Sequence, residues 1–259
     1  MNSMFSRTLK ALLAVAVVGV VVACGSSTTE DPFKPTRVIG LGDAYNDTSN
    51  AQYTVRRTTQ TITTVVAQVA ALYGAPTVES RAISTYATTQ DLVDQANGLG
   101  SLSATADLVV ITAGTEELKA GVSGATFLGN LKRALDIIKG KGAKHIVIME
   151  VVDITTGANA DAATLAFNTA VKADLAGYVD VARYGNISRP SAYFPSWATT
   201  GATAFCVTPT TFDGCDFTDA GNAAGDVATY FLADNLNPTP AGNQWLGTQL
   251  YNGTGGGWR

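Results

Sequence analysis

The stretch RVIGLGDAYNDTSN, residues 37–50, decides the fold of this chain. Its first six residues are mostly apolar and end in glycine, which predicts a buried strand followed by a tight turn. Asp43, Asn46 and Asp47 then place polar side chains directly behind that strand. In open α/β sheets, ligands bind outside the carboxyl ends of the strands. The stretch therefore marks both the first strand and a candidate functional loop.

Apolar runs and helical patterns alternate through the rest of the chain. Further strands are predicted at 77–83, 107–114, 144–154 and 178–184, and helices at 58–74, 126–139, 160–177 and 238–251. This alternation predicts a three-layer α/β/α sandwich with a mostly parallel, five-stranded sheet, of the flavodoxin-like kind. The loop-rich stretch 185–225 separates the last predicted strand from the last helix. We expect the chemistry at the segments that follow the strands.

Composition limits the possible partners. The chain has 259 residues, of which 46% are hydrophobic and 15% are charged, and its net charge is −4. These values suit one globular domain, and we expect a monomer. The absence of basic clusters argues against a nucleic-acid partner. Because phosphate loops, zinc spacings and nucleotide fingerprints are absent, we expect no cofactor and no metal.

The N-terminal residues indicate export. Basic Arg7 and Lys10 precede a short apolar run, and small residues then lead directly into Cys24. This arrangement resembles the bacterial lipobox, in which the cysteine carries lipid; the alternative is an ordinary signal peptide with a chance cysteine. We expect a lipid-anchored protein of the bacterial cell envelope, facing the periplasm or in the outer membrane. The predicted divisions are a signal peptide (1–23), a flexible tether (24–36), the folded domain (37–252) and a flexible tail (253–259).

Two further cysteines, Cys206 and Cys215, lie close together in the loop-rich stretch. Disulfides persist outside the cytoplasm, so an exported chain favours a bond between them. Closing so short a loop would stabilise the fold by about 2–3 kcal/mol. Two free thiols are the alternative.

Three motifs resemble those of the SGNH, or GDSL-type, ester hydrolases. In that family, the first strand leads into Gly-Asp-Ser-Leu-Ser-Asp-x-Gly-Asn, the third into Gly-x-Asn-Asp, and a Trp-Asp-x-x-His-Pro-Thr block precedes the last helix. Here the corresponding segments are Gly42-Asp43-Ala44-Tyr45-Asn46-Asp47-Thr48-Ser49-Asn50, Gly114-Thr115-Glu116-Glu117 and Ala233-Asp234-Asn235-Leu236-Asn237-Pro238-Thr239. Order, spacing and strand context agree over nearly the whole mature chain.

The resemblance implies a four-block active site. A serine attacks the ester, a histidine takes its proton, an aspartate orients that histidine, and a glycine amide and an asparagine hold the oxyanion. This sequence carries Ala44 for the serine, Glu116 for the asparagine and Asn237 for the histidine, and it retains Asp234. The second-block glycine falls near Ser84, where the alignment is loose.

These replacements remove the chemistry that the resemblance implies. Ala44 offers no nucleophile, and Asn237 cannot exchange a proton near neutral pH. An ionised Glu116 would oppose an oxyanion. The single histidine, His145, precedes a predicted strand and would lie at its amino end, away from the site. The sequence therefore favours an inactive hydrolase fold that binds an acyl, ester or glycan ligand or an envelope partner.

Two other hypotheses stay open. In the first, the chain is an active ester hydrolase whose catalytic groups are rearranged. Clustered carboxylates could act as an acid/base pair or bind a cation. Alternatively, Tyr45, Ser84 or Thr115 could serve as the nucleophile. The carboxylates would be Asp43, Glu116, Glu117 and Asp234. In the second, the pocket of a structural envelope protein is vestigial. We expect Asp43 to brace the first loop and Glu117 to face solvent at a helix start.

Overall fold

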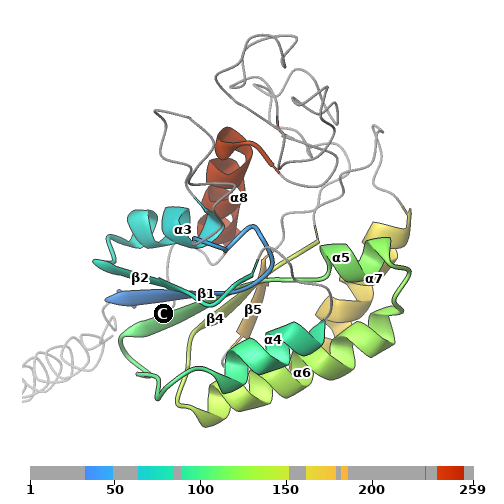
Figure 1. Ribbon diagram of the computed structural model, residues 1–259, viewed down its shortest axis with the longest axis horizontal. Helices are drawn as coiled ribbons and strands as arrows, with labels where there is room; N and C mark the ends of the chain where they lie inside the picture. Colours follow the sequence, from blue (N-terminus) through green and yellow to red (C-terminus); the bar gives the residue numbers. More distant parts are fainter. Residues whose placement is uncertain are drawn as a thin grey trace, which may run out of the picture. The chain divides into compact units, whose positions relative to one another are not determined.

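The computed structural model describes residues 33–48, 64–83, 89–151, 162–178, 182–185, 231 and 238–253. Within these ranges, five parallel strands form one sheet in the order β2-β1-β3-β4-β5 (Figure 1). The strands are β1 (Arg37–Gly42), β2 (Thr77–Ser80), β3 (Asp107–Thr112), β4 (Ile146–Met149) and β5 (Ala182–Gly185). The helices are α3 (Val65–Tyr73), α4 (Thr89–Asn97), α5 (Thr115–Lys119), α6 (Gly124–Gly140), α7 (Ala162–Asp174) and α8 (Pro240–Gly253), with a 3₁₀ turn η1 (Leu175–Tyr178) after α7.

Two apolar cores cover the two faces of the sheet. Ile39, Leu41 and Ile111 point into the core shared with α4, α6 and α7. Val38 and Val110 point into the opposite core, which α3 and α8 close. Successive side chains of a strand face opposite sides, so β3 is buried along its whole length and apolar from Leu108 to Ile111. The predicted three-layer sandwich and its parallel five-stranded sheet are confirmed.

Some elements differ from their predicted bounds. Helix α3 begins at Val65, because the Thr64 hydroxyl accepts a hydrogen bond from the Ala67 amide at 3.4 Å and caps its first turn. Strand β4 is shorter than the predicted 144–154, since it ends at Met149. Helix α4 was not predicted. It packs on the sheet through only three fully apolar side chains, those of Leu92, Val93 and Ala96, which give too short a pattern.

The packed part of the chain begins before the predicted domain boundary. Phe33, within the predicted tether, stacks on His145 with 3.6 Å between the ring centroids. Pro35 is buried, and the Thr36 amide donates to the carbonyl oxygen of Ala106 at 2.8 Å. His145 directly precedes β4, so it lies at the amino ends of the strands as expected.

Several predictions concern residues outside the described part of the chain. These are the signal peptide, the lipidation of Cys24, the pairing of Cys206 with Cys215, the loop-rich stretch and the tail. They stay predictions. Among the described residues, no helix is both long enough and apolar enough to cross a membrane.

Candidate functional site

The candidate site is built around the turn at which β1 ends. Gly42 has φ +106°, and a Cβ there would lie 1.7 Å from the carbonyl oxygen of Thr112. Only glycine fits this turn, because it tolerates the left-handed conformation and the close approach of β3. Gln95 of α4 holds the same residue through two hydrogen bonds: its Nε2 donates to the Gly42 carbonyl at 3.0 Å, and its Oε1 accepts from the Gly42 amide at 2.6 Å.

Asp43 braces the loop that follows, as the sequence indicates. Its Oδ1 accepts hydrogen bonds from the Thr112 hydroxyl at 2.7 Å and from the Tyr45 amide at 3.2 Å. Its own amide donates to the Thr112 carbonyl at 3.0 Å. The side chain is buried, with the residue 6% exposed. Asp43 therefore ties the β1 turn to the end of β3.

Burial raises the pKa of Asp43 to about 7. The hydrogen bonds from Thr112 and Tyr45 lower this pKa, but the loss of hydration outweighs them. The negative charges of Glu117 and Glu116 raise it further. Near neutral pH this carboxyl is therefore divided between its protonated and ionised forms.

Ala44 and Glu116, two of the positions that the family resemblance makes catalytic, follow neighbouring strands. Gly42 pairs with Thr112 at the ends of β1 and β3, so both segments leave the sheet at the same edge. Ala44 and Glu116 are both partly exposed. The structure thus brings Ala44 and Glu116 to the same edge of the sheet, where the charge of Glu116 acts on Asp43.

The expectation that Glu117 faces solvent is wrong, since the residue is 1% exposed. Gly114, at φ +108°, turns the chain from β3 into α5. Successive residues of a helix point about 100° apart, so this short helix leaves Glu116 at the rim and turns Glu117 inward. The charge of Glu117 acts on Asp43 as well.

Two residues that shape the site were missed by sequence reasoning. Thr112, at the end of a strand otherwise filled by apolar residues, donates to Asp43. Gln95 lies on a helix that the pattern did not predict. A polar residue closing an apolar strand was the available signal for Thr112, whereas Gln95 stands among other polar residues and had none.

A second side-chain amide fixes the end of β4 in the same way. Asn168 of α7 donates through Nδ2 to the Val151 carbonyl at 2.8 Å and accepts at Oδ1 from the Val151 amide at 3.0 Å. Asn46, in the loop that follows β1, donates from Nδ2 to the carbonyl oxygens of Leu41 in β1 and Val110 in β3. The strand ends that frame the site are therefore held rigidly.

The structure describes only some of the other site residues that the sequence predicts. Ser84, Asp234 and Asn237 lie outside the described residues. Tyr45 and Thr115, the other substitute nucleophiles, are buried. The described residues hold no group of three or more His, Cys, Asp or Glu side chains that could bind a metal ion.

Comparison with known proteins gives a structural likeness. No protein-family model and no curated protein matches the chain. An acetylxylan esterase from Geobacillus stearothermophilus matches with a TM-score of 0.52 and 15% identity, over 85% of this chain and 94% of its own. A lipase/acylhydrolase from Enterococcus faecalis matches with a TM-score of 0.50 and 16% identity, over 85% and 95%.

A member of the lipolytic G-D-S-L family from Veillonella parvula also matches, with a TM-score of 0.49 and 13% identity, over 83% of this chain and 96% of its own. The fold assignment rests on the two matches with the higher TM-scores. The chain has the fold of the SGNH/GDSL ester hydrolases, at low sequence identity.

Proposed function

We propose that this chain is an exported, lipid-anchored protein that binds a ligand at the carboxyl ends of its strands and does not hydrolyse it. The observation that carries the proposal is the β1 turn. Gly42, Asp43 and Thr112 form a complete, hydrogen-bonded frame, yet the residue that this frame presents is Ala44. The shape of the turn is kept while the nucleophile is lost.

The magnitude of that loss supports an inactive site. Removing the nucleophile of a serine hydrolase costs about a millionfold in kcat. Because catalytic groups act as a unit, Glu116 and Asn237 would add little to that loss. The retained Asp234 is therefore no argument for activity.

The charge of the site favours a neutral ligand. Asp43, Glu116 and Glu117 bring three carboxyl groups together at the site, two of them buried. A free fatty acid would bring a further negative charge to this cluster, whereas an ester or an acylated glycan would not. We therefore expect a neutral acyl ester or glycan ester as the ligand, with an envelope partner as the other candidate.

An active hydrolase with rearranged groups is the second candidate function. The pKa of Asp43, near 7, favours it, because a general base works best when its pKa lies near the working pH. Against it, Asp43 is buried, with the residue 6% exposed, so a substrate has little access to its carboxyl. We place this candidate below the binding function.

The test is a ¹⁵N NMR titration of the purified chain at pH 8. Ethyl butyrate, a neutral ester, should shift the amide resonances of Gly42, Ala44 and Glu116, whereas butyrate at the same concentration should not. A matched titration of Ala44→Trp, which fills the turn, should lose the shifts. Equal shifts with both compounds, or none with either, would refute ester binding at this site.

A further inference from the structure

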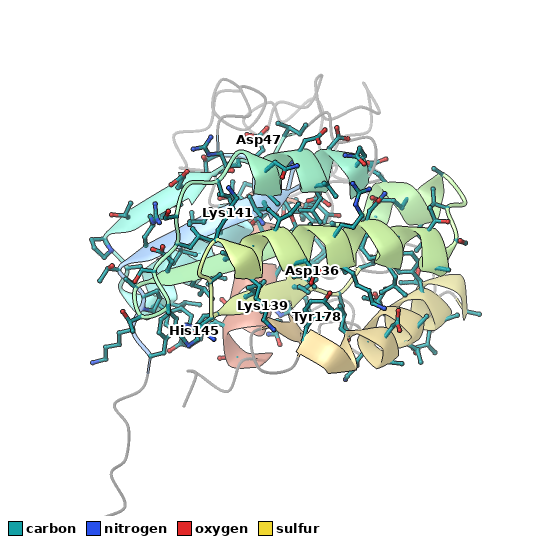
Figure 2. All side chains as sticks on the ribbon, turned by 90° about the horizontal axis from the view of Figure 1, so that it is seen from below. Asp47, Asp136, Lys139, Lys141, His145 and Tyr178 are labelled. Atoms are coloured by element: carbon teal, nitrogen blue, oxygen red, sulfur yellow. The ribbon has the colours of Figure 1, made fainter. Side chains whose placement is uncertain are left out.

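The edge of the sheet at which the strands begin is rich in lysine, whereas the candidate site at the other edge is rich in carboxylates. Because all five strands are parallel, they start at the same edge of the sheet. Lys34, Lys141 and Lys144 lie in the segments that precede β1 and β4, and Lys139 lies in the last turn of α6. We call these four lysines the basic rim. Figure 2 shows Lys139, Lys141 and His145 around the end of α6.

Three carboxylates near this edge form hydrogen bonds or ion pairs with residues other than the rim lysines. Asp107 is buried and accepts two hydrogen bonds from the Arg37 guanidinium, at 2.9 and 2.6 Å. Glu79 is shared by Arg37 at 3.4 Å and Arg81 at 2.9 Å. Asp136, one turn before Lys139, accepts from the Tyr178 hydroxyl at 2.8 Å, and its carboxylate offsets part of the positive charge of the rim.

Three of the rim lysines are exposed, and the fourth contacts neutral groups. Lys141 donates from Nζ to the carbonyl oxygens of Asn97 and Leu99, which are neutral groups. Lys34, Lys139 and Lys144 are exposed. The opposite end of the sheet carries Asp43, Asp47, Glu116, Glu117 and Glu150. The described part of the molecule is therefore basic where the chain enters the sheet and acidic at the candidate site.

The N-terminal segment enters the fold at the rim. Phe33 stacks on His145, and so its neighbour Lys34 is held close to Lys144. The amides of Thr36 and Arg37 both donate to the Ala106 carbonyl, at 2.8 and 3.1 Å. Phe33 lies nine positions after Cys24 in the sequence. Even fully extended, this segment would span only about 30 Å.

A groove adjoins the point of entry. Its volume is about 560 Å³, and the hydroxyl groups of Thr36, Thr77, Ser101 and Ser103 line it. Arg37 and Asp107, which are hydrogen-bonded to each other, lie in the same wall. The groove therefore adds polar surface beside the rim but no net positive charge, and the attraction to anionic lipid headgroups comes from the rim lysines.

We propose that the basic rim docks on the anionic headgroups of the bilayer that holds the lipid anchor. The inference rests on the proposed anchor at Cys24 and adds an orientation to it. The candidate site then faces away from the membrane, about 20 Å farther out along the six residues of β1. Its ligand would come from the space beyond the bilayer, not from the lipids beneath.

The expected strength follows from surface electrostatics. Each lysine near an anionic leaflet strengthens adsorption about fivefold, and the attraction fades over a Debye length of about 8 Å. Reversing the charge of two rim lysines should therefore weaken docking at least about 25-fold. High salt should have a similar effect.

The experiment uses the full chain, reconstituted into liposomes of phosphatidylcholine alone or with 30% phosphatidylglycerol, each containing a trace of dansyl-labelled lipid. Flotation reports anchoring, and energy transfer from the three tryptophans to dansyl reports how close the folded body lies to the bilayer. The rim variant is Lys34→Glu with Lys144→Glu. The matched control is Arg133→Glu with Lys172→Glu, which makes the same charge change at exposed positions on α6 and α7.

We expect flotation on both liposomes, and higher energy transfer with phosphatidylglycerol that falls in 500 mM NaCl and in the rim variant but not in the control. Flotation with equal energy transfer on both liposomes would overturn docking and leave the anchor intact. Flotation only with phosphatidylglycerol would support docking and refute the anchor. No flotation on either liposome, or equal losses in both variants, would overturn docking.

Discussion

Replacing Asp43 by asparagine should make the stability of the fold much less dependent on pH. In the folded protein, burial raises the pKa of this carboxyl from 3.8 to about 7. Between these values the folded state keeps a proton that the unfolded state has lost, so wild-type stability falls as the pH rises from about 4 to 7. Below this window both states are protonated, and above it both are ionised.

The size of the effect follows from the change in pKa. Moving the pKa from 3.8 to about 7 corresponds to a loss of about 4 kcal/mol in the free energy of unfolding. Asparagine cannot ionise, and its Oδ1 can still accept from Thr112 and Tyr45. The stability of Asp43→Asn minus that of the wild type should therefore grow by about 4 kcal/mol between pH 4 and pH 8.

Urea unfolding at several pH values, followed by circular dichroism, gives this difference. Asp94→Asn, at an exposed carboxylate on α4, is the matched control and should change stability by less than about 0.5 kcal/mol. Thr112→Val removes a donor to the ionised form, so it should cost more at pH 8 than at pH 4. A difference between Asp43→Asn and the wild type that stays constant from pH 4 to pH 8, or grows toward acid, would refute the reasoning.

Three further predictions concern the frame of the site and the anchor. Gly42→Ala should lower the free energy of unfolding by more than about 3 kcal/mol or prevent folding, because a Cβ there collides with the Thr112 carbonyl. The control is Gly129→Ala, in open space on α6, which should be neutral or stabilising. Thermal unfolding measures both variants. Gln95→Ala should lower the free energy of unfolding in urea by about 1–3 kcal/mol, since the Gly42 amide loses its side-chain acceptor while the Gly42 carbonyl keeps the Ile83 amide at 3.1 Å. Gln90→Ala on the exposed face of α4 should cost less than about 0.5 kcal/mol. Cells fed an alkyne-labelled palmitate should label the wild-type chain but not Cys24→Ser; equal labelling of both would contradict the anchor.

The fold could be predicted because three of its strands, β1, β3 and β4, are almost fully buried. The runs in β1 and β3 are apolar on successive residues, and this pattern occurs where helices cover both faces of a parallel sheet. Helix α4 escaped prediction because its buried face is only three side chains wide. A short helix of this kind is fixed by the core it covers more than by its own pattern.

The candidate site was predictable in position but not in detail. The polar residues after β1 and β3 follow from the topology, since parallel neighbours end at one edge. The burial of Glu117 does not follow, because it depends on the direction in which Gly114 turns the chain into α5. Nor does the role of Gln95, which reaches β1 across 53 positions in the sequence.

The most direct test of the central claim is the rate of hydrolysis of p-nitrophenyl acetate by the purified, folded chain between pH 6 and pH 9. We predict a rate equal to that of the heat-unfolded chain at the same concentration, because Ala44 offers no nucleophile and the neighbouring carboxyl, Asp43, is buried in the β1 turn. Saturable turnover that Asp43→Ala abolishes would contradict the account and favour a rearranged carboxylate site. Saturable turnover that survives Asp43→Ala together with Asp234→Ala would contradict it as well and point to catalysis elsewhere on the chain.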